Sequence, residues 1–137
     1  TASWLLEHLV DPLSTFRAVG RVLRPDGAFI FITPNKRHPL TIANRLAGRL
    51  GSLQGRLVDE LYGRAPEDTF STYYRANTTK ELFALIDASG LVPEIITRIA
   101  DPSYVAFNRL LFRAMSAIDE RLSEDRHIHI VGVARKK

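Results

Sequence analysis

Glu7 and His8 are the most chemically informative pair of side chains in the sequence, and they lie within the stretch WLLEHLVDP. An imidazole ordinarily titrates near physiological pH, so His8 is the best candidate for a general base. Glu7, beside it, is a candidate substrate-binding group. A structural interpretation stays open for both residues, because two polar side chains can also fix the loop that leads into the next helix.

A second set of polar residues follows an apolar run. Asn35 and His38 come directly after the predicted strand Ala28 to Thr33. Ligands of open α/β sheets gather at the carboxyl ends of strands, so Asn35 and His38 are predicted to border a substrate. The alternative is that Thr33-Pro34-Asn35 is a plain turn, which proline and asparagine favour.

Tyr73, Tyr74 and Arg75 precede a predicted helix and could reach the same substrate-binding end of the sheet. We predict that Tyr74 and Arg75 bind substrate, since a guanidinium group suits a carboxylate or a phosphate. A surface salt bridge is the alternative for Arg75.

His127 and His129 would share one face of the last predicted strand. A third ligand is not near them in sequence, and catalytic zinc usually takes three protein ligands. The chain also has no cysteine, which excludes thiolate metal sites, disulfides and thiol nucleophiles. We therefore predict no metal site.

These residues need a scaffold, and the first half of the chain predicts its first elements. Asp11-Pro12 favours the start of a helix, which the turn Arg24-Pro25-Asp26-Gly27 ends. The apolar run Ala28 to Thr33 is typical of a strand that is buried on both faces. Residues 36 to 64 predict one or two short helices, broken at glycines.

The second half alternates helix and strand. Residues 65 to 77 are an expected ordered loop, and Thr78 and Glu81 form a capping box for a helix that stops at Gly90. A strand at residues 91 to 99, a long helix from Ser103 to Leu122 and a strand at residues 127 to 135 follow. This order predicts an α/β domain.

Composition limits the function classes. Hydrophobic residues make up 45% of the chain and charged residues 25%, as in ordinary soluble proteins. The net charge of +4 comes without a nucleic-acid-binding motif, so no nucleic-acid partner is predicted. No apolar run approaches the roughly 20 residues that a membrane span needs, and a cytoplasmic location is the expectation.

Three segments resemble a known family. They are LEHLVDP (residues 6 to 12), RVLRPDGAFIFITPN (residues 21 to 35) and YYRANTTKELFALIDASGL (residues 73 to 91). Together they resemble the C-terminal half of class I S-adenosylmethionine-dependent methyltransferases, in particular the branch that includes enzymes of ubiquinone and menaquinone biosynthesis.

The resemblance implies a partial Rossmann-like fold with three layers. Its mixed sheet would place the last strand antiparallel between the strands at residues 28 to 33 and 91 to 99. Residues 1 to 137 would form the C-terminal part of one domain, with helical lid segments at about residues 36 to 64 and 103 to 122. The N-terminal half that builds most of the cofactor pocket would be missing from this chain.

The resemblance also implies a site. S-adenosyl-L-methionine would be the cofactor, with Ser3, Trp4 and Leu5 facing its methyl group. Plain core packing is the alternative for Trp4 and Leu5. In ubiquinone O-methyltransferases an acidic residue three positions before Glu7 completes a magnesium site; Trp4 stands there in this chain, so the metal site is expected to be lost.

The expected function is transfer of a methyl group to a small-molecule acceptor, with His8 as base. The basic, leucine-bearing stretch from Lys36 to Arg64 would be a lid over the site, or would contact a membrane surface peripherally. The competing hypothesis is a non-catalytic α/β interaction module without a cofactor, which binds a partner through an unpaired strand edge or its basic helices.

Overall fold

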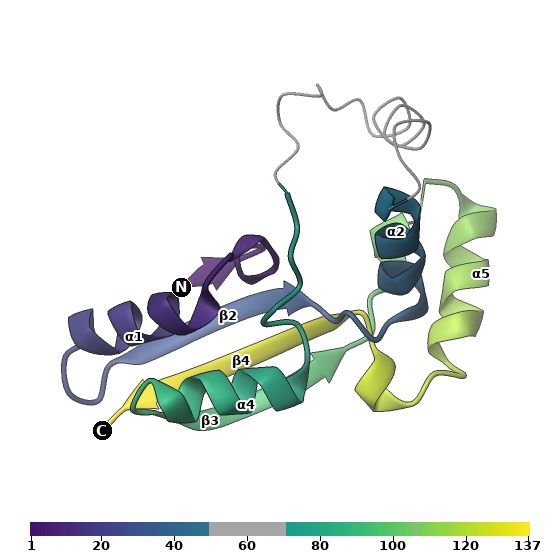
Figure 1. Cartoon of the computed structure of the whole chain (residues 1–137). Coiled ribbons are helices and arrows are strands. Elements are labelled where there is room, and N and C mark those ends of the chain that lie inside the picture. Colours follow the sequence, from purple (N-terminus) through teal and green to yellow (C-terminus); the bar gives the residue numbers. More distant parts are fainter. Residues whose placement is uncertain (50–70, 106) are drawn as a thin grey trace.

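The computed structural model describes residues 1–49, 71–105 and 107–137 (Figure 1). The strands are β1 (Ala2–Ser3), β2 (Ala28–Pro34), β3 (Leu91–Ile99) and β4 (His129–Lys136). The α-helices are α1 (Pro12–Val22), α2 (Pro39–Arg49), α4 (Thr79–Ala88) and α5 (Arg109–Asp119). Short 3-10 turns span Leu6–His8, Pro102–Val105 and Glu124–Arg126. Within the described residues, no helix has the length and apolar character to cross a membrane.

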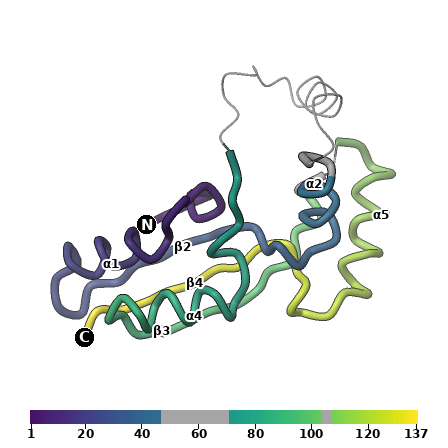
Figure 2. Tube along the Cα trace, viewed as in Figure 1, coloured from purple at the N-terminus to yellow at the C-terminus, as the bar shows by residue number. Residues whose placement is uncertain are grey.

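The four strands form one mixed sheet in the order β1-β2-β4-β3. β1 pairs parallel with β2, and β4 pairs antiparallel with both β2 and β3. The predicted α/β fold class is therefore confirmed, including the insertion of the last strand between the two earlier ones. The tube in Figure 2 shows β4 running between β2 and β3 towards the C-terminus.

Helices α1 and α4 cover one face of the sheet. Phe16 of α1 packs edge-on against Phe29 and Phe31 of β2, with ring centroids 5.5 and 6.2 Å apart. Leu82 and Ile86 of α4 complete this core over β4. Burying a large apolar side chain contributes about 1.5–3 kcal/mol, so Phe16 on α1 and Leu82 and Ile86 on α4 fix the two helices to the sheet.

The opposite face of the sheet carries exposed apolar side chains. Ile30 and Ile95 lie in one cross-strand row, because both are in register with Val133 of β4. Ile99 continues that face of β3. The described helices thus supply one of the two helical layers expected for a three-layer fold.

Two capping predictions are confirmed by side-chain hydrogen bonds. The Asp11 carboxylate accepts from the backbone N–H of Ser14 at 3.1 Å and starts α1. The Thr78 hydroxyl accepts from the N–H of Glu81 at 3.2 Å and starts α4. The Glu81 carboxylate bonds the N–H of Asn77, one residue before the position that a capping box would use.

The prediction of one continuous helix from Ser103 to Leu122 is wrong. The chain forms a 3-10 turn at Pro102–Val105, and α5 starts later, where the Asn108 side chain accepts from the N–H of Leu111 at 2.9 Å. Asn108 is extended at φ −153°, so the helical backbone cannot run through it.

The first predicted lid segment, residues 36 to 64, is described only as far as Arg49, and its remainder lies outside the described residues. Helices α2 and α5 stand side by side beyond the sheet, at the end where β2 and β3 finish (Figure 1). The contact between His38 and Asp119 joins the start of α2 to the end of α5.

Candidate functional site

A buried carboxylate lies at the carboxyl ends of β1 and β2. Glu7 belongs to the 3-10 turn that follows β1, and its side chain is 7% exposed. Because β1 and β2 run parallel, the turn after β1 reaches the same edge of the sheet as Thr33 near the end of β2. The Thr33 hydroxyl donates to Glu7 Oε2 at 3.2 Å.

A chain of donors converges on this carboxylate. The side-chain amide of Asn77, which is fully buried, donates to Thr33 Oγ1 at 2.7 Å and to the carbonyl of Pro34 at 2.9 Å. The Thr33 hydroxyl links the two side chains, because it accepts a hydrogen bond from Asn77 and donates one to Glu7. Such a chain stabilises negative charge in a buried place, where an unpaired carboxylate would be costly.

His8 faces the other oxygen of Glu7. Its Nε2 lies 4.0 Å from Glu7 Oε1, while its Nδ1 lies 2.9 Å from the carbonyl oxygen of Ser71. A carbonyl only accepts, so Nδ1 carries the proton in the neutral ring and Nε2 keeps its lone pair. The His8 side chain is 29% exposed, and the Glu7 carboxylate lies where it would stabilise positive charge on the ring.

The segment that precedes α4 is tied onto this edge. The backbone N–H groups of Tyr73 and Tyr74 both donate to the carbonyl of Glu7, at 2.7 and 3.1 Å. Lys36 donates to the carbonyl of Tyr74 at 3.2 Å and pairs with the Glu81 carboxylate. These bonds hold the predicted loop across the end of β2.

Tyr74 adopts an unusual backbone conformation within this segment, with φ at +51°. Burial, followed by the negative charge of Glu7, raises the pKa of the Tyr74 phenol above its ordinary value. The Arg45 guanidinium lies over the ring, 5.5 Å from its centroid. The predicted substrate residue Tyr74 therefore sits beside the Glu7 carboxylate, with a cation above its ring.

Ser3, Trp4 and Leu5 lie where β1 ends. Ser3 is the last strand residue, and the N–H of Trp4 donates to the carbonyl of Ile32 at 3.1 Å. Trp4 has φ at +55°, and its side chain and that of Leu5 remain 41% and 47% exposed. Neither is a fully buried core residue, although the indole contacts the His129 ring edge-on with centroids 4.8 Å apart.

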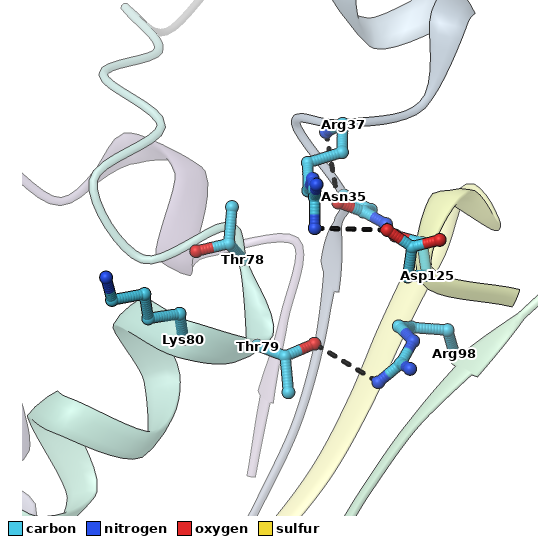
Figure 3. A pocket seen from close by; sticks show the side chains of 7 residues that line it. All are labelled: Asn35, Arg37, Thr78, Thr79, Lys80, Arg98 and Asp125. Atoms are coloured by element: carbon cyan, nitrogen blue, oxygen red, sulfur yellow. Dashed lines mark hydrogen bonds and ion pairs between the residues drawn. The ribbon is translucent and has the colours of Figure 1, made fainter.

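Asn35 is buried and lies after β2. Its amide donates to the carbonyls of Asp125 and His127 at 3.0 and 2.9 Å, and its Oδ1 accepts from the N–H of Arg37. Asn35 also lines a cavity with residues of α4 and β3, and His8 is not among the lining residues (Figure 3). The structure therefore gives Asn35 a role in shaping that cavity.

His38 is fully buried at the start of α2. Its Nδ1 accepts from the N–H of Leu40 at 3.2 Å, so Nε2 carries the proton and faces Asp119 Oδ1 at 3.4 Å. Burial lowers the pKa of His38, and the hydrogen bond to Asp119 opposes that effect in part. The buried His38 ring, hydrogen-bonded at both nitrogens, therefore joins α2 to α5 and does not lie at the Glu7–His8 pair.

Arg75 is likewise separated from the mouth of the site. Its guanidinium donates to the carbonyl of Val10 and lies over the Tyr73 ring, 5.6 Å from the centroid. The side chain fastens the pre-α4 segment to the chain that leads into α1.

The two late histidines do not share a strand, because β4 begins at His129 and His127 precedes it. His129 Nε2 lies 3.1 Å from Asp101 Oδ2. The Ser103 hydroxyl and then His129 lower the pKa of the Asp101 carboxyl. Among the described residues, no group of three or more His, Cys, Asp or Glu side chains is arranged to hold a metal ion.

Sequence reasoning missed Thr33, Asn77 and Lys36. Thr33 was assigned to an apolar strand, although a single hydroxyl at its carboxyl end was a usable signal. Asn77 immediately precedes the Thr78 cap, where a second capping-type residue is redundant unless it serves another purpose. Both are far in sequence from Glu7, so their meeting depends on the fold.

A comparison with models of known protein families identifies the family of this chain. A family model described as a methyltransferase domain matches residues 1–91, which is more than half of the chain. The matched part contains β1, the Glu7–His8 turn, β2 and α4. No curated protein matches the chain.

Proposed function

The chain belongs to the methyltransferase domain family, and on that premise we propose that it carries the acceptor side of an S-adenosylmethionine-dependent methyl transfer to a small molecule. The motifs LEHLVDP and RVLRPDG support the branch that includes enzymes of ubiquinone and menaquinone biosynthesis. The observation that carries the proposal is a buried carboxylate next to an imidazole, because His8 Nε2 lies 4.0 Å from Glu7 Oε1 while His8 Nδ1 is bonded to the Ser71 carbonyl.

S-adenosylmethionine supplies a methyl group already activated on a sulfonium centre. Ser3, Trp4 and Leu5 would hold it, because all three are exposed at the carboxyl end of β1 and Trp4 and Leu5 offer aromatic and apolar surface there. An indole face attracts a cation, so Trp4 suits a positively charged sulfur.

His8 has the task of removing a proton from the acceptor. Its Nε2 accepts that proton while Nδ1–H stays bonded to the Ser71 carbonyl. Glu7, 4.0 Å away, offsets the positive charge that then develops on the ring. Thr33 and Asn77 keep the Glu7 carboxylate oriented, so the charge partner does not turn away during the reaction.

The test uses the complete protein that contains this chain, with transfer of labelled methyl groups from S-adenosylmethionine as the readout. His8→Gln keeps a polar side chain of similar length but removes the base. We expect turnover to fall by about 10²- to 10⁴-fold, the usual contribution of a general base, with cofactor affinity retained. The acidic limb of the pH–rate profile should also disappear.

Arg21→Gln is the matched control, since Arg21 is exposed on the last turn of α1, at the other end of the sheet. Unchanged turnover in the His8 variant would remove His8 from the mechanism. No methyl transfer by the unaltered protein with any acceptor would favour the non-catalytic module instead.

A further inference from the structure

A cavity of about 500 Å³, lined by polar and charged residue types, lies beside the Glu7 network on the helix-covered face of the sheet. It is formed by the end of β2, the first turn of α4, the end of β3 and the turn before β4 (Figure 3). Its lining residues are Asn35, Arg37, Thr78, Thr79, Lys80, Arg98 and Asp125. Three of these side chains are cationic and one is a carboxylate, so the cavity has a positive balance.

Arg98 is the central cation. It is in register with Ile130 of β4, which places it on the covered face of β3, and it is half-buried. Its Nε donates to the carbonyl of Glu124 at 3.2 Å and its Nη1 to the Thr79 hydroxyl at 3.3 Å. Within the described part of the chain, Arg98 forms no ion pair within 4.0 Å, although its charge contributes to lowering the pKa of Asp125, so the partly desolvated guanidinium keeps donors for an anion.

Arg37 supplies a second guanidinium on the other side of the cavity. It pairs with Asp125 at 3.0 Å, and the two side chains are 58% and 42% exposed. An ion pair this exposed contributes at most about 1 kcal/mol, so Arg37 can exchange Asp125 for a more highly charged ligand. Asp125 is itself held by the Ser123 hydroxyl at 2.6 Å and would stay in place.

Thr79 adds a neutral donor next to the Arg98 guanidinium (Figure 3). Its oxygen accepts from Arg98, which leaves the hydroxyl hydrogen for a ligand oxygen. Lys80 is exposed, and its ammonium points away from Arg37 and Arg98 in Figure 3. Its flexible stem lets it contribute long-range attraction, but the directional donors are those of Arg98, Arg37 and Thr79.

We propose that this cavity binds the phosphate of a phosphate monoester carried by the methyl acceptor, with Arg98 as its main ligand. Three donors from different elements match the three terminal oxygens of a phosphate, whereas a carboxylate offers two. A water molecule occupies about 30 Å³ in the liquid, so the cavity has room for a phosphate and the atoms next to it.

The location links this proposal to the proposed function, on which it rests. Asn77 contacts Thr33 in the Glu7 network, and the next residue, Thr78, lines the cavity. Both sites therefore lie at the carboxyl end of β2. An acceptor anchored by its phosphate here would present the rest of its structure at the same edge of the sheet as His8.

The test is a titration of the full chain with potassium phosphate, glycerol 1-phosphate and sodium acetate at constant ionic strength, followed by NMR of the arginine Nε–H groups. We expect glycerol 1-phosphate to shift the Arg98 resonance saturably, to bind at least as tightly as inorganic phosphate, and to bind more tightly than acetate. Arg98→Gln should weaken glycerol 1-phosphate binding by about tenfold or more, with Arg98→Lys between the two. Arg21→Gln, remote from the cavity, should bind like the unaltered chain.

Arg37→Gln keeps the proposal testable if Arg98→Gln fails to fold, since the largely exposed Arg37 can be replaced without disturbing the core. It should also weaken glycerol 1-phosphate binding. Equal affinity for glycerol 1-phosphate in the unaltered chain and in the Arg37 and Arg98 variants would overturn the site. So would a chain that binds inorganic phosphate but does not bind glycerol 1-phosphate. Binding through Arg98 in a protein that transfers no methyl group would refute the proposed function and leave the anion site standing.

Discussion

Thr33→Val tests whether the buried chain of hydrogen bonds around Glu7 is a single coupled unit. The substitution replaces the hydroxyl by a methyl group of almost the same size, in a side chain that is fully buried. It removes the donor to Glu7 Oε2 and the acceptor of the 2.7 Å bond from Asn77. Asn77 keeps its bond to the Pro34 carbonyl, so the loss concentrates on the carboxylate.

The expected cost follows from the two bonds. A hydrogen bond to a charged group contributes about 1.5–3 kcal/mol and a neutral one about 0.5–1.5 kcal/mol. The 3.2 Å separation of Thr33 Oγ1 from Glu7 Oε2 is long for a charged pair, which places that bond near its lower limit. We therefore expect the free energy of unfolding to fall by about 2–3 kcal/mol.

The assay is urea denaturation of the unaltered chain, Thr33→Val, Glu7→Gln and the double variant. If Thr33 acts through Glu7, the double variant should be more stable than the sum of the single effects predicts, with a coupling energy of about 1–2 kcal/mol. Thr97→Val is the matched control. Thr97 is also a strand threonine but is exposed, so its replacement should change stability by about 0.5 kcal/mol at most.

Additive effects of the Thr33 and Glu7 substitutions would refute the reasoning, because two groups that share a bond cannot be independent. A Thr33→Val chain as stable as the Thr97 control would refute it more directly. In either case Glu7 would be oriented by its backbone turn alone, and Thr33 would be plain core.

Two further perturbations probe the elements around the site. Burial lowers the pKa of His38, so the folded chain binds that proton less readily than the unfolded chain. The neutral His38 ring therefore contributes its full stability above the unfolded-state pKa of about 6.5, and this contribution is lost as the pH falls below that value. His38→Gln should flatten the decline in the free energy of unfolding between about pH 7 and pH 5. A slope equal to that of the unaltered chain would contradict this. Gly132→Ala would place a methyl group 2.2 Å from Phe31 Cζ, so we expect a loss of about 1–3 kcal/mol in thermal unfolding, partly recovered when Phe31→Leu is added. An unchanged melting temperature for Gly132→Ala would show that the Phe31 ring moves aside freely.

Much of the fold could be predicted because its signals are local. The Asp11 and Thr78 caps and the apolar run that forms β2 each depend on a few neighbouring residues. The position of β4 between β2 and β3 has no such local signal, because nothing in residues 127 to 135 indicates which strands they pair with. That position was predicted from the resemblance to the family, and the strand register confirms it.

The break before α5 shows where local signals mislead. The apolar stripe of Phe107, Leu111 and Met115 keeps helical spacing across the point where α5 begins. Periodicity reports which side chains share a face, but it does not report whether the backbone is continuous between them. Asn108, a strong helix-capping residue inside that stripe, was the signal that a new helix begins there.

The functional roles of the predicted site residues separate for a similar reason. Sequence alone made His8 a candidate base and His38 a candidate substrate contact, yet the His8 ring is bonded to the Ser71 carbonyl and partly exposed, whereas the His38 ring is enclosed between two helices. Partners 63 and 81 residues away decide this difference. Such contacts depend on tertiary structure, which a single sequence does not encode in any short window.

The same tertiary contacts make the proposed methyl-transfer site and the proposed anion cavity depend on one segment. The backbone of Tyr73 and Tyr74 is bonded to Glu7, Asn77 is bonded to Thr33, and the next two residues enter the cavity as the first turn of α4. A change that loosens this segment would therefore shift the Glu7–His8 pair and the Arg98 cavity together. If binding of the acceptor at Arg98 orders this segment, it also orders the Glu7 carboxylate beside His8. Binding of the acceptor and orientation of the proposed base would then be coupled.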